Sequence, residues 1–101
     1  MWLMLFYDLP MHTRANQREY ARFRKSLQKD GFCMFQFSIY VRYCMSDENA
    51  QTHMRRTLKA LPAKGAVGMM TITDQQFKSI KLYNDKNSDN IIAPTQQLEL
   101  F

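Results

Sequence analysis

Residues 2–10 of the chain read Trp2-Leu3-Met4-Leu5-Phe6-Tyr7-Asp8-Leu9-Pro10, six apolar or aromatic residues followed by one carboxylate. A short continuous apolar run of this kind is typical of a strand buried in the centre of a sheet. Pro10 ends the run, because proline has no N–H to donate to a neighbouring strand, and it biases Leu9 away from helix. We therefore expect a central strand over Trp2–Tyr7 with Asp8 at its end.

The next segment, residues 13–29, has the pattern of an amphipathic helix. Tyr20, Phe23 and Leu27 recur at helical spacing and form one apolar stripe. Asp30-Gly31 stops the helix, because glycine can adopt the left-handed conformation that closes a helix C-terminus.

Residues 32–43 alternate apolar and polar side chains as a strand does, with Phe35, Phe37, Ile39, Val41 and Tyr43 in one series. Twelve residues is long for one strand, so we expect a bend or strand–strand junction near residues 36–38. Ser38 and Tyr40 then share a face with Arg42. One interpretation is that they border a functional site, and the other, which we expect by default, is a solvated or hydrogen-bonded strand face.

A second helix is predicted after Ser46, a favourable N-cap residue. Its predicted buried positions are Ala50, Met54, Thr57, Leu58 and Leu61. A strand over 67–73, with Val67, Met69 and Thr71 on one face, and a helical turn over 74–77 complete the regular pattern. Beyond them we expect a short edge strand over 79–83, a mobile polar loop over 84–90 and a last strand over 96–101.

Two helices on one face of an antiparallel sheet make an α+β sandwich, and the ferredoxin-like β-α-β-β-α-β arrangement fits the order best. On this interpretation, residues 1–83 form the domain, and residues 84–101 form the loop and an extra strand. A spare strand needs an edge to pair with, and a second subunit supplies one, so we expect a homodimer.

The composition sets the class of protein. With 101 residues, 46% of them apolar, the chain has room for one small globular domain. Cys33 and Cys44 have no zinc-like spacing, and His12 and His53 are isolated, so we expect reduced thiols. Neither a signal peptide nor a membrane-spanning run is present, which favours the cytoplasm.

Asp8 is the strongest candidate for chemistry, since site residues often follow strand ends. The structural alternative is an ordinary turn aspartate. One carboxylate makes a poor metal site, but Mg²⁺ is often held by one or two carboxylates together with substrate phosphates. Two copies of Asp8 at a dimer axis would share one ion, which would activate water for phosphodiester attack. Apart from Asp8, the sequence offers no Ser-His-Asp set, His–carboxylate pair or glycine-rich phosphate loop.

Net charge points to a polyanion partner. The chain carries +5, and residues 13–29 alone account for all of it. Arginine binds phosphate through two parallel hydrogen bonds, and a row at one-turn spacing suits a duplex backbone, although a solvated helix face is the alternative. The candidate nucleic-acid-binding residues are Arg14, Arg18, Arg22, Lys25 and Lys29. The aromatic residues have the spacing of a core rather than of stacking platforms.

Three stretches in the right order resemble the CRISPR-associated protein 2 family, the small partner of the CRISPR integrase. They are Leu5-Phe6-Tyr7-Asp8-Leu9-Pro10, then Gly31-Phe32 with Gln36-Phe37-Ser38-Ile39-Tyr40-Val41, and Thr71-Ile72-Thr73-Asp74-Gln75-Gln76-Phe77. The last is similar to members from type II systems. The resemblance covers essentially the whole chain, with Ile39 where the family usually has valine.

The resemblance implies a ferredoxin-like homodimer whose C-terminal strand packs on the partner subunit. It implies a DNA-binding adaptor that works with the integrase in spacer acquisition, and a metal-dependent endonuclease acting on RNA or duplex DNA with Mg²⁺ as cofactor. The family aspartate corresponds to Asp8, its neighbouring aromatic to Tyr7 and its serine to Ser38.

Two other hypotheses remain open at this point. The first is a free-standing, toxin-like metal-dependent endoribonuclease of the same fold. The second is a ligand-sensing regulatory domain, which would also dimerise through its sheet but would not need a basic helix.

Overall fold

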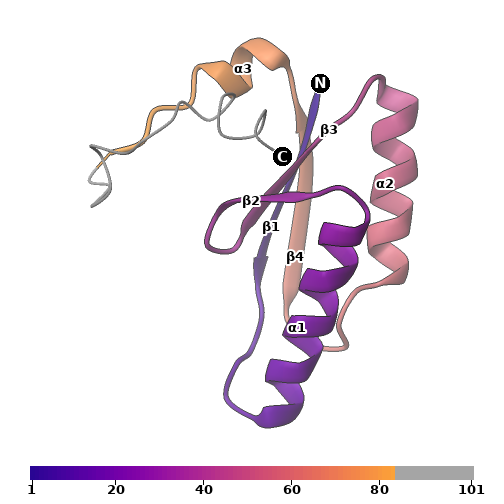
Figure 1. Ribbon diagram of the computed structural model, residues 1–101, viewed down its shortest axis with the longest axis vertical. Coiled ribbons are helices and arrows are strands. Elements are labelled where there is room, and N and C mark those ends of the chain that lie inside the picture. The colour runs from indigo at the N-terminus through magenta and orange to yellow at the C-terminus, as the bar shows by residue number, and fades with distance from the viewer. Residues whose placement is uncertain (84–101) are drawn as a thin grey trace.

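Seven elements follow one another along residues 1–83, the part of the chain that the computed structural model describes (Figure 1). They are β1 (Trp2–Asp8), α1 (Arg14–Lys29), β2 (Cys33–Gln36), β3 (Ile39–Tyr43), α2 (Asp47–Lys59), β4 (Ala66–Ile72) and α3 (Asp74–Lys78). The first six elements have the order β-α-β-β-α-β, which confirms the predicted ferredoxin-like α+β class.

The four strands form one antiparallel sheet in the order β2-β3-β1-β4, with β1 in the centre as predicted. Leu5 of β1 lies between Tyr40 of β3 and Met69 of β4. Because side chains alternate along a strand, the odd-numbered residues of β1 share one face and the even-numbered residues share the other. Asp8 therefore lies on the same face as Phe6.

Helices α1 and α2 cover the face of the odd-numbered β1 residues. Leu3 and Leu5 are fully buried there and pack with Phe23 and Leu27 of α1, which belong to the predicted helix stripe. The predicted stop of α1 is also confirmed, since Gly31 follows the helix with φ of +93°. Removing large apolar side chains from water at this face stabilises the fold, by about 25 cal/mol per Å² buried.

Within residues 1–83, the opposite face of the sheet, here called the open face, is covered only at one end. Helix α3 confirms the predicted helical turn and brings Phe77 onto Trp2, with ring centroids 4.3 Å apart. Met70, opposite Met4 in the middle of β1, remains 49% exposed, and Phe6, nearer the end of β1, remains 43% exposed. Among the described residues, the open face therefore has a covered apolar end and an end that no other element covers, and Asp8 lies at the latter.

The predicted junction near residues 36–38 is confirmed, but the prediction for its side chains is partly wrong. The register shifts between Met34 and Gln36, and Ser38 lies in a turn with φ of +70° rather than on a strand. This irregularity interrupts the alternation, so Tyr40 enters the core with no exposed surface and Phe37 is 76% exposed. The expectation of a solvated face shared by Ser38, Tyr40 and Arg42 therefore fails for Tyr40.

Helix α2 begins after Ser46 as predicted, and Ala50 and Thr57 are buried. Leu58 and Leu61 were expected in the core but are 56% and 37% exposed. Leu58 points away from the buried side of the helix, and Leu61 lies beyond its last residue, Lys59. The buried arc instead includes His53, which the sequence analysis treated as isolated.

Residues 79–83 form no strand, contrary to expectation. Ser79 is the C-cap of α3, and its N–H donates to the carbonyls of Gln75 and Gln76. The segment therefore begins as the end of a helix rather than as a strand. The predicted loop over 84–90 and strand over 96–101 lie outside the described residues. Within residues 1–83, no helix is long and apolar enough to cross a membrane.

Candidate functional site

Asp8 lies at the rim of a shallow hollow of about 490 Å³ on the open face. The hollow is formed where β1 ends, β4 begins and the β2–β3 turn crosses. Its lining residues are Phe6, Tyr7, Asp8, Phe37, Ser38, Ile39, Ala66, Val67 and Gly68. Asp8 is exposed, and within residues 1–83 its carboxylate has no hydrogen-bond or ion-pair partner, so its oxygens are free to accept.

Ser38 is brought to Asp8 by the hairpin turn. The N–H of Tyr7 donates to the carbonyl of Ser38 over 3.1 Å, which fixes the turn against the end of β1. Ser38 also adopts a left-handed conformation, with φ of +70°, that few residues other than glycine adopt. Strained backbone of this kind often accompanies functional sites. The structure thus places Asp8 and Ser38 on the lining of one hollow.

Tyr7 contributes main chain to the hollow, but its phenol lies on the other side of the sheet. The Tyr7 hydroxyl donates to the Tyr20 hydroxyl over 3.1 Å beneath α1. Burial, and then the hydrogen bond to Tyr20, raise the pKa of the Tyr7 phenol well above its usual range. The phenol therefore stays protonated at neutral pH and is a structural donor rather than a base beside Asp8.

The basic row lies on the exposed surface of α1, on the helix layer and so on the opposite side of the sheet from Asp8. Its five members are all exposed: Arg14, Arg18, Arg22, Lys25 and Lys29. Arg22 is already engaged, because its guanidinium pairs with Glu19 at 2.9 Å and donates to the carbonyl of Ala60 at 3.1 Å. The structure therefore places the two candidate sites, the Asp8 hollow and the basic row, on opposite sides of the sheet.

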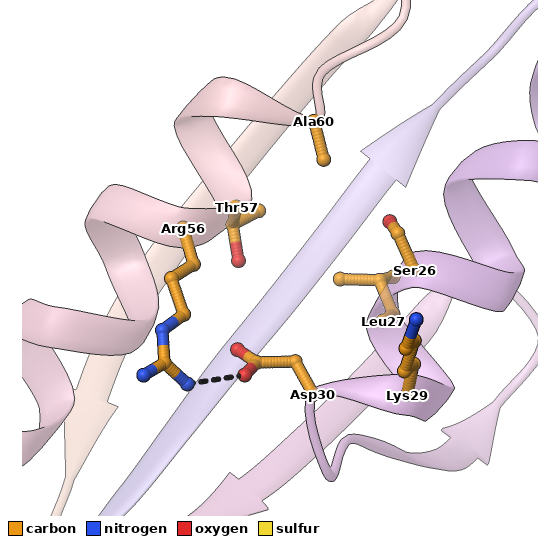
Figure 2. A pocket seen from close by; sticks show the side chains of 7 residues that line it. All are labelled: Ser26, Leu27, Lys29, Asp30, Arg56, Thr57 and Ala60. Atoms are coloured by element: carbon orange, nitrogen blue, oxygen red, sulfur yellow. Dashed lines mark hydrogen bonds and ion pairs between the residues drawn. The ribbon is translucent and has the colours of Figure 1, made fainter.

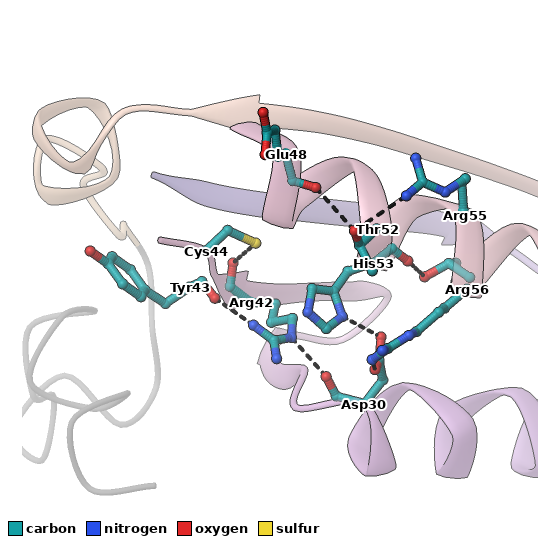
Figure 3. Close-up of polar contacts among 10 residues, drawn as sticks. Asp30, Arg42, Tyr43, Cys44, Glu48, Thr52, His53, Arg55 and Arg56 are labelled. Carbon is teal, nitrogen blue, oxygen red and sulfur yellow. Dashed lines mark hydrogen bonds and ion pairs between the residues drawn. The ribbon is translucent and has the colours of Figure 1, made fainter. Parts of the chain in front are cut away.

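A polar cluster that the sequence analysis missed connects the two helices (Figure 3). The Asp30 carboxylate bonds to the His53 ring at 2.7 Å and to the Arg56 guanidinium at 2.8 Å. Arg42 donates to the Asp30 carbonyl at 2.7 Å. Helical spacing was the available signal, since His53 lies three residues after buried Ala50 and four before buried Thr57.

Desolvation raises the pKa of Asp30, but the hydrogen bonds from His53 and Arg56 outweigh it, and the net pKa lies below the ordinary value.

Beside this cluster, a groove of about 330 Å³ runs between α1 and α2 (Figure 2). Its Ser26 and Thr57 hydroxyls both donate to main-chain carbonyls, and the Asp30 oxygens are occupied. The hydroxyls and the carboxylate that line the groove are therefore already engaged within the fold, and we assign the cluster a structural role.

Metal binding by one chain alone has little support in this geometry. Among the described residues, no three His, Cys, Asp or Glu side chains come together as a metal site. Asp8 supplies one carboxylate, which suits only an ion that keeps water or substrate phosphate oxygens as its other ligands. The cysteines match expectation as free thiols, and burial raises the pKa of both Cys33 and Cys44.

Comparison with known proteins identifies the family. The model of the family described as CRISPR associated protein Cas2 matches residues 1–80, which include both the Asp8 hollow and the basic row. The chain belongs to the Cas2 family. This confirms the resemblance seen in the three sequence stretches.

Several Cas2 relatives match over most of this chain. The CRISPR-associated endoribonuclease Cas2 of Flavobacterium psychrophilum is 48% identical over 101 residues, covering all of this chain and 88% of the relative. The protein of the same name from Parvibaculum lavamentivorans is 46% identical, with both chains fully covered. That of Ligilactobacillus salivarius is 39% identical over 79% of each chain. The Cas2 family gives this chain a CRISPR-associated role.

Proposed function

We propose that this Cas2-family protein is a homodimeric adaptor of CRISPR adaptation that binds duplex DNA within the integrase complex. The single observation that carries the proposal is the basic row on α1, where the whole net charge of +5 is concentrated on one exposed helix. Such a role places the protein in the prokaryotic cytoplasm, together with the integrase and the repeat array.

The chemistry of the row supports binding through the DNA backbone. Arginine and lysine side chains one helical turn apart repel one another, and phosphate oxygens would relieve that repulsion. Contacts to phosphate fix position and orientation without reading sequence. We therefore expect duplex binding with little base preference and a steep dependence on salt.

The homodimer is supported by the open face. Apolar side chains are exposed there at Phe6, Met70 and Tyr43, and burying them against a second copy would be favourable. In addition, β4 is an edge strand of the sheet formed by residues 1–83, and the outer hydrogen-bonding groups of an edge strand can pair with another strand. We propose that residues 96–101 supply that strand to the partner subunit.

A second candidate function, metal-dependent endonuclease activity, is favoured by the Asp8 hollow. The relatives from Flavobacterium psychrophilum and Parvibaculum lavamentivorans are both called endoribonucleases. We propose that Asp8 and its copy in the partner subunit hold one Mg²⁺, with RNA or duplex DNA as substrate. When bound, the ion would activate water and neutralise charge at a phosphodiester. A free-standing endoribonuclease that acts without the integrase is the alternative form of this function.

The adaptor role is tested by removing the basic row. The variant Arg14→Gln/Arg18→Gln/Lys25→Gln leaves Arg22 in place, because Arg22 also joins α1 to the end of α2. We expect duplex affinity to fall about tenfold or more. The negative slope of the logarithm of the association constant against the logarithm of the salt concentration should become shallower by about 0.9 for each lost phosphate contact. In an assay with the integrase from the neighbouring reading frame, integration of a short duplex into a repeat array on a plasmid should fall in parallel.

The matched control removes the same charge elsewhere. Lys64, Lys78 and Lys81 are exposed and lie outside α1, and their triple glutamine variant should bind and integrate nearly as the wild type does. Equal losses in both triple variants would mean that net charge, rather than the α1 row, governs binding. Integration that proceeds equally well without this protein would overturn the adaptor role.

A further inference from the structure

We propose that the duplex contacts both helices of the helix layer, with three cations of α2 forming a second phosphate-binding row across the groove from α1. They are Arg55, Arg56 and Lys59, here called the α2 row, and all three are exposed. The proposal rests on the proposed adaptor function, because it assigns further residues that hold the same duplex. The charge of the sequence had indicated only the row on α1.

Helix α2 separates its charges along its length. Its first turn carries Asp47 and Glu48, and the α2 row lies towards its other end, so the two groups nearly cancel in the sequence. A rise of about 1.5 Å per residue puts Glu48 and Arg55 roughly 10 Å apart along the helix axis. A phosphate beside the α2 row therefore meets mainly positive charge, although the chain outside residues 13–29 has no net charge.

The two rows meet at the groove between α1 and α2. Lys29 of α1 and Arg56 of α2 both line this groove of about 330 Å³ (Figure 2). Where Ala60 lines it, Arg22 reaches across from α1 and donates to the Ala60 carbonyl. The one carboxylate among the lining residues, Asp30, is already engaged in the polar cluster. The groove is thus bordered by cations from both helices.

The α2 row has hydrogen-bond donors that can reach phosphate. Among the described residues, Lys59 has no ion-pair or hydrogen-bond partner, and the Arg55 guanidinium bonds only to Thr52 of its own helix, at 3.3 Å. Arg56 gives one nitrogen to Asp30, and its side chain is 61% exposed. Arg55 and Lys59 also lie one helical turn apart, so they repel each other, and a phosphate would relieve that repulsion.

A structural role is the simpler explanation for basic residues near a helix C-terminus, because they interact favourably with the helix dipole. Arg56 and Lys59 lie in the last turn of α2, and Arg56 also joins α2 to Asp30. Arg55 lies before the last turn, where the dipole effect has faded, so this explanation does not account for it. A structural role predicts lower stability with unchanged DNA binding, whereas the α2 row predicts weaker binding by a protein that stays folded.

Duplex binding by a variant that keeps Arg56 tests the α2 row. Arg55→Gln/Lys59→Gln leaves the ion pair of Arg56 with Asp30 in place, and urea unfolding checks that the variant stays folded. Titrated with a fluorescently labelled DNA duplex, the variant should bind at least about fivefold more weakly, with a shallower dependence on salt than the wild type. Phosphates whose ethylation blocks binding should also be fewer for the variant than for the wild type.

The matched control is Lys78→Gln/Lys81→Gln, which removes the same charge from exposed positions outside α1 and α2 and should leave duplex affinity nearly unchanged. Equal losses in the two double variants would overturn the α2 row, as would unchanged affinity in Arg55→Gln/Lys59→Gln.

The triple variant of the α1 row separates this proposal from the adaptor function. If that variant loses duplex affinity while Arg55→Gln/Lys59→Gln does not, the adaptor function stands and only the α2 row is refuted. A wild-type protein that binds no duplex would refute the adaptor function itself.

Discussion

At the scale of single residues, Asp8 and Asp30 show how surroundings decide what a carboxylate does. Both oxygens of Asp30 are occupied by His53 and Arg56, so that side chain joins parts of the fold. Asp8 is exposed and, within residues 1–83, makes no hydrogen bond with its carboxylate. A carboxylate with free lone pairs at the rim of a hollow is available to a metal ion or a proton.

The variant Asp8→Asn should therefore abolish cleavage while leaving the fold and duplex binding intact. We expect a loss of roughly 100-fold or more in kcat, the scale of losing a group that acts in the chemical step. Asp47→Asn is the control, because Asp47 is another exposed aspartate, at the start of α2. Cleavage would be followed on labelled RNA and duplex DNA with Mg²⁺ present. Equal cleavage by Asp8→Asn would point to a contaminant or to another site.

Gly68→Ala tests how closely β4 supports Phe6. The added methyl group would lie 2.3 Å from the present position of the Phe6 ring, so the ring must turn away from the strand. We expect unfolding in urea to show a loss of about 1–3 kcal/mol, the usual cost of overpacking. The double variant Gly68→Ala/Phe6→Leu should recover part of that loss. Unchanged stability in the single variant would mean that the ring has room to move at no cost.

At the scale of elements, Asp30 joins the end of α1 to α2 and, through its carbonyl, to β3. The variant Asp30→Asn should lower the free energy of unfolding at pH 7 by about 1–3 kcal/mol, since hydrogen bonds to charged groups are lost. In the folded protein the pKa of Asp30 lies below the ordinary aspartate value of 3.8. Its contribution is therefore present above about pH 4 and is lost as the pH falls through the folded-state pKa.

Urea unfolding of both proteins between pH 7 and pH 3 measures this linkage. The wild type should lose its advantage over Asp30→Asn below about pH 4, while the variant shows a flatter profile. Glu48→Gln is a suitable control, because its side chain is exposed and bonds to no described residue. A difference that persists undiminished at pH 3 would show that the charge of Asp30 does not matter.

The same elements show what the sequence could predict. Helix α1 followed from the spacing of Phe23 and Leu27, and the position of the hairpin followed from the length of the 32–43 segment. Local spacing failed where the backbone became irregular, as in the turn that sends Tyr40 to the core and leaves Phe37 outside. It also failed for the contact of His53 with Asp30, because that contact depends on how two helices pack.

The candidate site, like the fold, could be predicted from the sequence only in part. Asp8 was singled out as a carboxylate at a strand end and Ser38 by the family resemblance, and the structure places both on one hollow. The aromatic rings beside them could not be assigned from sequence, because alternation in a strand does not say which face a second layer covers. Tyr7 illustrates the converse, since it adjoins Asp8 in the chain but directs its phenol to the opposite side of the sheet.

At the scale of the whole molecule, the two sides of the sheet have different chemistry. The helix layer presents arginine and lysine side chains, which suit the phosphates of a duplex. The open face presents a carboxylate and aromatic rings at one end and apolar side chains along its length. A dimer formed through the open face would leave both helix layers outside, so one particle would display two basic surfaces for DNA.

The variant Met70→Glu tests this arrangement. Met70 is 49% exposed on the open face, and a closed two-fold interface would bring the substitution in both copies into the contact. Burying unpaired carboxylates costs several kcal/mol, so we expect the dimer dissociation constant to rise at least about 100-fold while the monomer stays folded. Leu58→Glu is the control, because Leu58 is an apolar residue of similar exposure, 56%, on α2. Sedimentation equilibrium and circular dichroism separate dissociation from unfolding, and a dimer that survives Met70→Glu but not Leu58→Glu would move the interface to the helix layer.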